Sequence, residues 1–302
     1  MNKMLNSTVK HIRFIVNPIS GVNRNPQKIL KWVYEIFEGS SLKVDHVFTE
    51  GPGDGTRLAG AAVEEKVDLV VAVGGDGTIN EIGRGLVNSR SALGVVPAGS
   101  GNGFARNLKI PLEQRRAIEM LKDPVIRKID VGKINQHYFF NVAGAGLDAE
   151  IGHRFEHFGM RGPIPYFITG TKAFFEYRPQ PLKIRYLDEV VKTSPMILSI
   201  ANLPQYGNGA IIAPEARADD GLLDLVLLEK LPLTRVLPNL YRLFNGTINR
   251  VKGYHDIQIK KAVIERPAEG YIHTDGNPHL ESARLEIEVV PQALMVAVPP
   301  SD

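Results

Sequence analysis

The sequence contains no cysteine, and this absence excludes several kinds of chemistry at once. Thiol nucleophiles, disulfide bonds and cysteine-ligated zinc sites all need a residue that the chain lacks. No stretch approaches the roughly 18 consecutive apolar residues of a membrane-spanning helix. The first residues also lack the long apolar core of a signal peptide. We therefore expect a cytoplasmic protein.

A strong excess of charge of one sign is also missing. Lys and Arg number 36 against 33 Asp and Glu, which gives a net charge of +3. So mild an excess is compatible with anionic ligands but does not indicate a nucleic-acid partner. With 43% hydrophobic and 23% charged residues in 302, the composition is that of a folded globular protein. The chain is long enough for two domains, each with its own core.

The first part of the chain alternates between two kinds of apolar pattern. The run Val67–Val73 is rich in β-branched residues, and the stripe from Ile79 to Val87 that follows has helical spacing. Strict alternation of this kind predicts a parallel sheet with helices on both faces. We expect strands at 12–16, 43–48, 67–73 and 92–96, and helices at 26–37, 54–65, 79–87 and 112–121.

After Lys128 the pattern changes to short apolar runs separated by Gly, Pro and Asp turns. This pattern predicts an antiparallel sheet or sandwich. We therefore expect an α/β domain over residues 1–127 and a β-rich domain over residues 128–302, with the last strand returning to the first domain. The expected strands of the second domain are 138–144, 181–187, 194–202, 222–228, 255–264 and 283–290.

Glycine and small polar residues gather at three strand ends of the first domain. They form "NPISG" (17–21), "GGDGTINE" (74–81) and "PAGSGNGFAR" (97–106). In an open parallel sheet such loops meet at one edge, where ligands bind. Glycines let backbone N–H groups approach a ligand, and a helix that follows adds partial positive charge, so both features suit phosphate.

Asp76 is an unusual residue in such an anion-binding turn. Either Mg²⁺ or a hydroxyl group is its partner, or Asp76 or Thr78 simply caps the helix that follows. Phosphate, Mg²⁺ and a carboxylate together indicate phosphoryl transfer. The P-loop pattern GxxxxGK[ST] is absent, and no GxGxxG follows the first strand. A nucleotide bound here is therefore held without a P-loop lysine.

Two further segments, "ARADDGLLDL" (216–225) and "TDGN" (274–277), complete a set of five. The set resembles the diacylglycerol kinase catalytic family, which includes soluble bacterial diacylglycerol kinases and the sphingosine and ceramide kinases. The segments occur in the family's order and cover nearly the whole chain. The resemblance implies an NAD kinase/diacylglycerol kinase-like fold in which the α/β domain binds ATP in the interdomain cleft and the β-rich domain binds the lipid.

The resemblance also implies roles for individual residues. Asp275 would be the general base for the lipid hydroxyl, although Asp-Gly is also typical of hairpin turns. Asp76 would act beside it on a metal or a hydroxyl. Asp220 would bind a structural Mg²⁺, helped by the backbone carbonyls of Arg217 and Leu222. The residues implied to line the ATP site are Asn17, Thr49, Gly74, Gly75, Asp76, Gly77, Thr78, Asn80, Ser100 and Asn102.

Two positions depart from the family pattern. Asn277 stands where the family commonly has a glutamate, and an amide cannot accept a proton. Either Asp275 serves alone, or activity is weak. Gly103 stands where many bacterial relatives have an acid, and such a change can alter substrate or metal preference.

A lipid substrate predicts apolar surface that also carries basic residues. The segments 154–179 and 231–250 combine both kinds of residue. Either segment can cover a lipid pocket, rest on an anionic membrane or belong to the core. We expect at most peripheral, reversible contact with the inner membrane face, and a homodimer is possible.

The expected function is an ATP-dependent lipid kinase that transfers the γ-phosphate to a hydroxyl of diacylglycerol or a related lipid. A kinase for sphingoid bases or ceramide is one alternative. NAD kinase is another, because it shares a Gly-Gly-Asp-Gly loop, but "NPISG" and "DDGLLD" argue against it. A nucleotide- or lipid-binding regulator with weakened catalysis is the third, motivated by Asn277.

Overall fold

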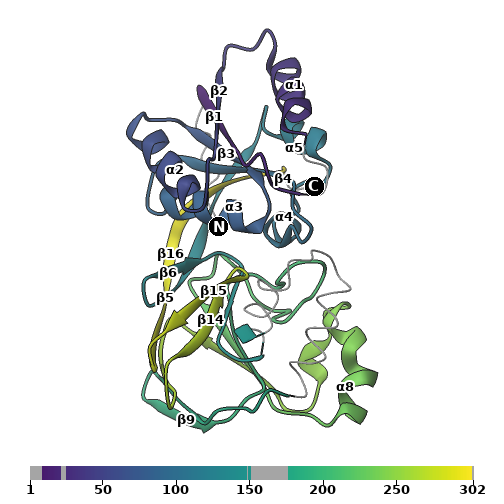
Figure 1. Cartoon of the computed structure of the whole chain (residues 1–302), viewed down its shortest axis with the longest axis vertical. Helices are drawn as coiled ribbons and strands as arrows, with labels where there is room; N and C mark the ends of the chain where they lie inside the picture. The colour runs from purple at the N-terminus through teal and green to yellow at the C-terminus, as the bar shows by residue number, and fades with distance from the viewer. Residues whose placement is uncertain (1–8, 22–24, 148, 151–175, 301–302) are drawn as a thin grey trace. The chain divides into compact units, whose positions relative to one another are not determined.

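The computed structural model describes residues 9–21, 25–147, 149–150 and 176–300. The chain divides into two units, one of residues 1–129 with 292–302 and the other of residues 130–291 (Figure 1). Two strands, β5 (Val125–Ile134) and β16 (Arg284–Val298), have residues in both units.

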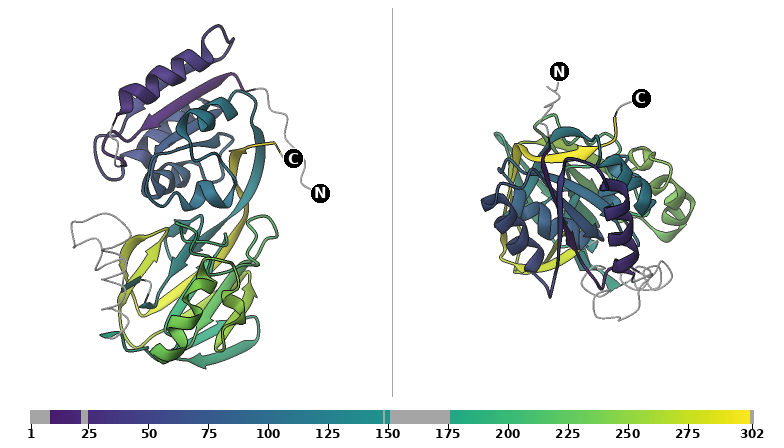
Figure 2. Two further views of the ribbon diagram at one scale, coloured as in Figure 1. Left: turned by 90° about the vertical axis from the view of Figure 1, so that its right-hand side faces the viewer. Right: turned by 90° about the horizontal axis from the view of Figure 1, so that it is seen from above.

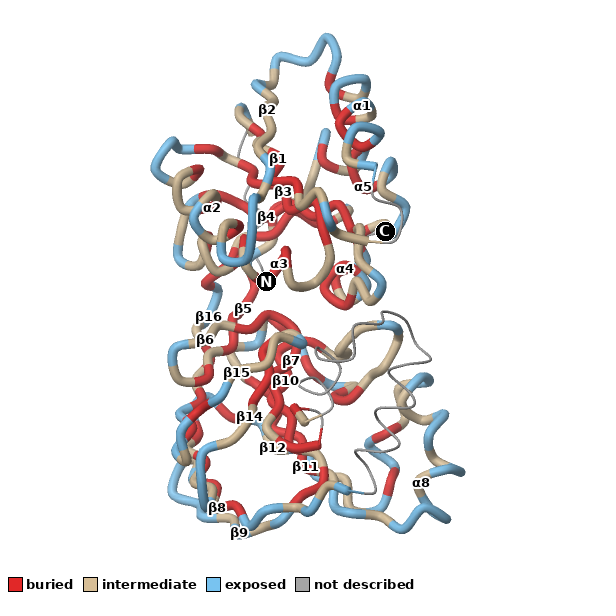
Figure 3. Tube along the Cα trace, viewed as in Figure 1, coloured by how far each residue is buried: buried red, intermediate tan, exposed pale blue. Residues whose placement is uncertain are grey.

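The first unit contains a parallel sheet with the strand order β2-β1-β3-β4, and the last residues of β16 run parallel to β4. Every residue of β3 and β4 is buried, as the β-branched runs predict (Figure 3). The elements are β1 (His11–Val16), α1 (Pro26–Phe37), β2 (Lys43–Phe48), α2 (Asp54–Glu64), β3 (Leu69–Gly74), α3 (Asp76–Leu86), β4 (Ala92–Pro97), α4 (Gly103–Asn107) and α5 (Gln114–Met120).

Helices cover both faces of this sheet. Helix α1 packs with α5, and α2 packs with α3 on the opposite face (Figure 2). Helix α1 begins where the sequence favours a helix start: the side chain of Asn25 accepts the N–H of Lys28 at 3.0 Å, and Pro26 occupies the first turn. The predicted α/β architecture of this part of the chain is confirmed.

An ion-pair cluster joins β1 to β2 and to the end of α2. Arg13 Nε lies 2.7 Å from Asp45 Oδ1, and Arg13 Nη2 donates to Asp45 Oδ2 at 3.0 Å. Arg13 Nη2 also lies 2.8 Å from Glu65 Oε2. The hydrogen bonds from Arg13 lower the pKa of Asp45 to about 2, with smaller help from His11. The pair therefore stabilises the fold only while Asp45 is ionised.

We expect Asp45→Asn to lower the free energy of unfolding by about 1 kcal/mol at pH 7, a value reduced for the partial exposure of the pair. The contribution of Asp45 is fully present above its unfolded pKa of about 4 and is lost as the pH falls towards 2. Urea unfolding at pH 7 and near pH 2 measures the difference, with Asp123→Asn as a control. An equal loss at both pH values would contradict an electrostatic origin.

The second unit is a sandwich of two sheets. In one sheet β13 pairs with β16 and β8, and β8 pairs with β9. In the other, the described strands follow the order β12-β11-β10-β7-β14-β15. The strands are β6 (His137–Phe139), β7 (Val142–Gly144), β8 (Leu182–Tyr186), β9 (Glu189–Thr193), β10 (Ile197–Ala201), β11 (Leu223–Leu228), β12 (Tyr254–Ile259), β13 (Lys261–Glu265), β14 (Gly270–Thr274) and β15 (Asn277–Glu281).

Side chains from both sheets form one core. Ile184 and Ile264 from the first sheet share it with Leu198, Leu225 and Ile272 from the second. The predicted antiparallel, β-rich character of this part of the chain is confirmed. In the described part of the chain, none of the helices combines the length and apolar character needed to cross a bilayer.

Several expected elements differ in detail. The predicted strand 255–264 is wrong as a single strand, because β12 ends at Ile259 and β13 begins at Lys261 in the other sheet. Helix α4 and the strands β5, β9, β14 and β15 were not predicted. Within the segment 231–250 lie α8 (Leu233–Asn239), η1 (Leu240–Leu243) and η2 (Ile248–Arg250). Of the segment 154–179, residues 154–175 lie outside the described residues.

Candidate active site

The three glycine-containing loops of the first unit contact one another, as the strand order predicts. The Gly75 N–H donates to Ser20 Oγ at 2.9 Å, and Asn17 Nδ2 donates to Thr78 Oγ1 at 2.9 Å. These bonds join the loop after β1 to the loop after β3. The N–H of Phe104 donates to Asp76 Oδ1 at 3.2 Å and joins the loop after β3 to the loop after β4.

Backbone approaches backbone closely where these loops meet. A Cβ atom built on Gly99 would lie 2.6 Å from Gly75 Cα, closer than real Cβ atoms come. Gly21 has a φ of +82°, and a Cβ there would lie 2.2 Å from the carbonyl oxygen of Ala98. Only glycine fits at these two positions, so the loops present bare backbone.

Helix α3 begins at Asp76, three residues earlier than the sequence predicts. Its N-cap residue is Gly75, which has no side chain with which to cap the helix. The first N–H groups of a helix have no partner within it and carry partial positive charge. The hypothesis that Asp76 or Thr78 caps α3 is wrong. The two side chains instead hold Phe104 and Asn17, which belong to the neighbouring loops.

Asn102 fixes the shape of the loop after β4. Its backbone is left-handed, with a φ of 49°. Its Oδ1 accepts the N–H of Gly99 at 3.0 Å, and its Nδ2 donates to Gly99 O at 2.9 Å. Ser100 is exposed in the same loop, whereas Asn80, also expected to line the ATP site, is buried within α3.

Thr49 lies at the same edge of the sheet, because it directly follows β2 and its N–H donates to Val16 O at 3.0 Å. Glu81 has a role that was not predicted. Its two carboxylate oxygens accept the N–H groups of Gly53 and Gly55 at 3.0 and 3.1 Å, and so fix the start of α2. Glu81 is the last residue of "GGDGTINE", but its two hydrogen-bond partners lie 26 and 28 residues earlier in the chain, so the local pattern does not reveal its role.

In the second unit, Asp275 lies in the turn of the hairpin formed by β14 and β15. Thr274 pairs with Asn277, and Asp275 and Gly276 have positive φ values of 51° and 87°. The interpretation of Asp-Gly as a two-residue hairpin turn is therefore confirmed. The turn holds the Asp275 side chain at one end of the hairpin.

Three backbone N–H groups donate to the carboxylate of Asp275. Oδ2 accepts from Phe140 at 2.8 Å, and Oδ1 accepts from Asn141 at 2.8 Å and Val142 at 3.1 Å. These bonds explain why the expected strand 138–144 is interrupted between β6 and β7. They also fix the carboxylate firmly and stabilise its ionised form.

The region of the expected metal ligands is a turn just before β11. Asp220 is exposed, and its Oδ1 accepts the N–H of Leu222 at 3.0 Å. The N–H of the next residue, Gly221, donates to Asp130 Oδ2 at 2.7 Å, so two carboxylates shape the turn. Among the described residues, no group of three or more His, Asp or Glu side chains is arranged to hold a metal ion.

The surroundings of this turn are acidic. Asp224 is 2% exposed, and its burial raises its pKa to about 7, with further effects from the charges of Asp256 and Asp220. One carboxylate combined with backbone carbonyls is an oxygen donor set of the kind that hard divalent cations take. The oxygen atoms of the turn are therefore of the kind that a divalent cation takes.

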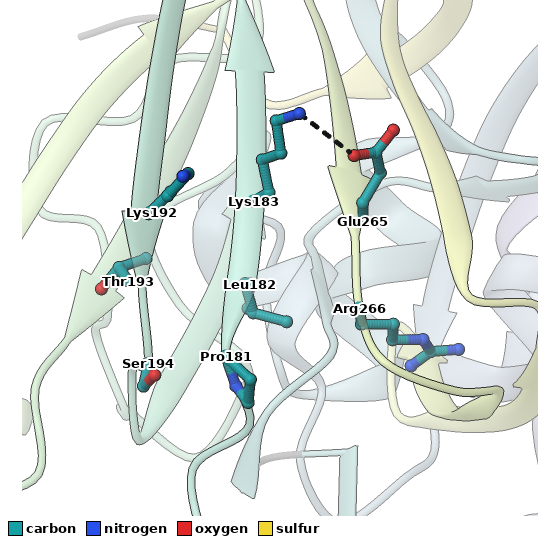
Figure 4. Close-up of a pocket in the computed structure, with 8 residues that line it drawn as sticks. All are labelled: Pro181, Leu182, Lys183, Lys192, Thr193, Ser194, Glu265 and Arg266. Carbon is teal, nitrogen blue, oxygen red and sulfur yellow. Dashed lines mark ion pairs between the residues drawn. The ribbon is translucent and has the colours of Figure 1, made fainter.

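The cavities that described residues of the second unit line include an open one and a more enclosed one. The larger, about 460 Å³, is an open groove along the β8-β9 hairpin and β13, where Lys183 faces Glu265 (Figure 4). The smaller, about 230 Å³, is more enclosed, and Tyr177, Leu198 and Tyr271 are among the residues that line it. Neither cavity includes a residue of the three loops, so both are separate from the candidate nucleotide site.

Comparison with known proteins places both parts of the chain in one family. Residues 11–134 match the diacylglycerol kinase catalytic domain, and residues 141–298 match the YegS C-terminal NAD kinase beta sandwich-like domain. A diacylglycerol kinase of Bacillus subtilis (strain 168) is 33% identical over 234 residues, which are 76% of this chain and 77% of that protein. The chain belongs to the diacylglycerol kinase catalytic family.

Other similar proteins agree with this membership of the diacylglycerol kinase family. A Chromohalobacter salexigens protein named probable lipid kinase YegS-like is 31% identical over 253 residues, 82% of this chain and 81% of that protein. The crystal structure of a diacylglycerol kinase from Bacillus anthracis str. Sterne has a TM-score of 0.76 at 22% identity. The match covers 97% of this chain and 98% of that one, so the two share a fold.

The two departures from the diacylglycerol kinase pattern occupy defined positions. Asn277 is the first residue of β15 and pairs with Thr274 across the hairpin, two residues after Asp275. Gly103 is the first residue of α4 and is buried next to Asn102. Both departures therefore lie beside residues expected to act in the reaction.

Proposed function

We propose that this protein is an ATP-dependent kinase that transfers the γ-phosphate to a hydroxyl group of diacylglycerol or a closely related lipid. The observation that carries the proposal is the convergence of three strand-end loops, where a side chain on Gly99 would lie only 2.6 Å from Gly75 Cα. Such bare backbone at the start of a helix binds phosphate groups. Membership of the diacylglycerol kinase family supports a kinase.

ATP is assigned to these loops of the first unit. Gly74, Gly75, Gly77 and Thr78 supply backbone next to the phosphates. Asn17, Ser100 and Asn102 supply polar side chains at the same edge, with Thr49 at the end of β2 and Asn80 supporting α3 from within. Asp76 joins the loops after β3 and β4 through Phe104, and we assign it a second contact with Mg²⁺ or the acceptor hydroxyl.

The metal assignment rests on the chemistry of the donor atoms. Asp220, with the carbonyl oxygens of Arg217 and Leu222, would hold a structural Mg²⁺. A Mg²⁺ ion held there would support the turn, whereas a Mg²⁺ ion bound with ATP would neutralise phosphate charge. The residues themselves orient the turn before β11.

Asp275 is the proposed proton acceptor for the lipid hydroxyl. An alcohol is a weak nucleophile, so a carboxylate within hydrogen-bond reach assists when the bond to phosphorus forms. Three backbone N–H groups hold this carboxylate in place, and we assign the hydroxyl to it. The transfer step requires the hydroxyl and the γ-phosphate to meet during turnover, with the β-rich unit contributing the lipid.

Turnover with ATP tests the proposal against its alternatives. We expect Mg²⁺-dependent phosphorylation of one lipid from a panel of diacylglycerol, ceramide, sphingoid base and monoacylglycerol in detergent micelles, and none of NAD. Transfer should stop in EDTA. Asp76→Ala should abolish it, and Asp123→Ala is the control for a change of charge outside the loops. Phosphorylation of NAD alone would overturn the proposal in favour of an NAD kinase, and ATP binding without any transfer would favour a regulator.

A further inference from the structure

A fourth loop lies at the same edge of the parallel sheet as the three loops of the candidate site. It joins β2 to α2, covers residues 49–55 and contains three glycines, and we call it the β2 loop. Thr49, its first residue, is assigned to the ATP site. Because the strand order is β2-β1-β3, the β2 loop lies two strands from the start of α3, about 10 Å away at the usual strand spacing.

The backbone of the β2 loop is held by carboxylates of the chain itself. The N–H of Glu50 donates to Asp54 Oδ2 at 2.9 Å. The N–H groups of Gly53 and Gly55 donate to Oε1 and Oε2 of Glu81 at 3.0 and 3.1 Å. These donors are already occupied, so the β2 loop is poorly suited to bind phosphate through its backbone.

The starts of α2 and α3 therefore differ in what they offer to an anion. Glu81 lies in the second turn of α3 and places its carboxylate against the first residues of α2, where the partial positive charge of a helix start attracts anions. Helix α3 itself starts after Gly75, whose bare backbone the proposed function gives to phosphate. Because Glu81 takes the place of an external anion at α2, the phosphates of a nucleotide are left to α3.

A close contact between α2 and α3 brings Glu81 to the loop. The two helices pack side by side (Figure 1). Gly55 is buried, and a Cβ atom built on it would lie 2.9 Å from both Cβ and Oε2 of Glu81. Thr56 Oγ1 donates to the carbonyl oxygen of Glu81 at 2.8 Å. The β2 loop is therefore shaped from the same helix that begins at the phosphate loops.

The charge around the β2 loop is negative. Glu50 is exposed, and the carboxylates of Asp54 and Glu81 lie at the start of α2. The N–H of Glu50 lowers the pKa of Asp54, with help from Arg57, which pairs with it. One arginine against three carboxylates leaves an excess of negative charge, which repels phosphate. Carboxylates do accept hydrogen bonds from hydroxyl groups, such as those of a ribose.

We propose that Glu81 is a positioning residue that holds the β2 loop in the shape that binds the nucleoside part of ATP. The inference deepens the proposed function and rests on it. Glu81 acts on the nucleotide through Gly53 and Gly55 and does not itself contact it. ATP that places its phosphates at the start of α3 and extends along this edge of the sheet brings its ribose and base to the β2 loop.

Calorimetric titration with ATP and with tripolyphosphate, which has no nucleoside, tests the proposal. Glu81→Gln sets an NH₂ group against one of the two backbone N–H groups. It should lower the affinity for ATP at least about tenfold, the effect of one hydrogen bond to a charged group, and leave the affinity for tripolyphosphate as in wild type. In turnover, KM for ATP should rise while kcat stays the same. The control Thr56→Val removes the other hydrogen bond between α2 and Glu81 and should bind both ligands as wild type does.

Gly55→Ala repeats the test without changing Glu81. The new methyl group would displace the carboxylate from the β2 loop, so the same selective loss of ATP affinity is expected. Its control is Gly60→Ala, in the same helix, where a Cβ meets nothing within 4 Å.

Three other results would count against the assignment. Wild-type ATP affinity in Glu81→Gln, or an equal loss in Thr56→Val, would overturn the inference and leave the kinase intact. An equal loss for ATP and tripolyphosphate would locate the effect at the phosphates and overturn the nucleoside assignment. Absence of ATP binding in wild type would overturn the proposed function, and this inference with it.

Discussion

Gly99→Ala is expected to lower kcat/KM for ATP by at least about 100-fold. The new methyl group would lie 2.6 Å from Gly75 Cα and 3.0 Å from Asn102 Oδ1, and backbone cannot move aside as a flexible side chain can. The loops after β3 and β4 must therefore separate. A displacement of about 1 Å at groups that position a substrate is enough for a loss of this size. Overpacking of this kind also lowers the free energy of unfolding by about 1–3 kcal/mol.

Gly60→Ala is the matched control, because it makes the same chemical change in α2. A Cβ there meets nothing within 4 Å, and alanine favours a helix over glycine by up to about 1 kcal/mol. This variant should keep full activity and gain stability. Calorimetric titration with ATP, in the absence of lipid, locates the defect of Gly99→Ala in nucleotide binding. Equal ATP affinity in the two variants would contradict the assignment of the phosphates to these loops.

The sequence predicts the architecture of the first unit well because its signals are local. The buried run that forms β3 and the helical stripe of α3 lie within about twenty residues and need no distant partner. Helix α4 was missed because it has only five residues and starts after a left-handed asparagine, so no periodic pattern develops. In the second unit, the apolar run that includes β12 and β13 continues across the point where the chain changes sheets.

The contacts that shape the candidate site are long-range and escape a reading of local pattern. The convergence of the loops follows from strand order in a parallel sheet, which sequence alternation predicts. That Asp76 accepts the N–H of Phe104, 28 residues away, does not follow from alternation. Nor do the bonds from Phe140 and Asn141 to Asp275, across 135 and 134 residues. A carboxylate that holds backbone N–H groups has no distinctive sequence pattern around it.

Asp275→Asn is expected to lower kcat about 10³-fold, within the range for loss of a general base. The carboxamide also places an NH₂ group or a single oxygen where Phe140, Asn141 and Val142 now donate, so the fold should lose about 1–3 kcal/mol of stability. A structural defect alone can therefore reduce activity. The two effects are separated by measuring kcat well below the unfolding temperature of the variant. The affinity for ATP is measured as well, and it should equal that of wild type.

Gly276→Ala separates them, because it strains the same turn and leaves the carboxylate in place. Gly276 has a φ of +87°, which alanine adopts only with strain, and a Cβ there meets nothing within 4 Å. We expect a loss of stability but little loss of kcat. If Gly276→Ala and Asp275→Asn lose equal activity, Asp275 has a structural role only.

Adding Asn277→Glu to Asp275→Asn provides a carboxylate two residues further on. We expect this second substitution to restore part of the lost kcat without restoring the hydrogen bonds that the backbone N–H groups of residues 140–142 donate to Asp275. Such a rescue would assign the lost activity to a carboxylate at this end of the hairpin rather than to the backbone bonds of the turn, because the added glutamate restores the carboxylate alone.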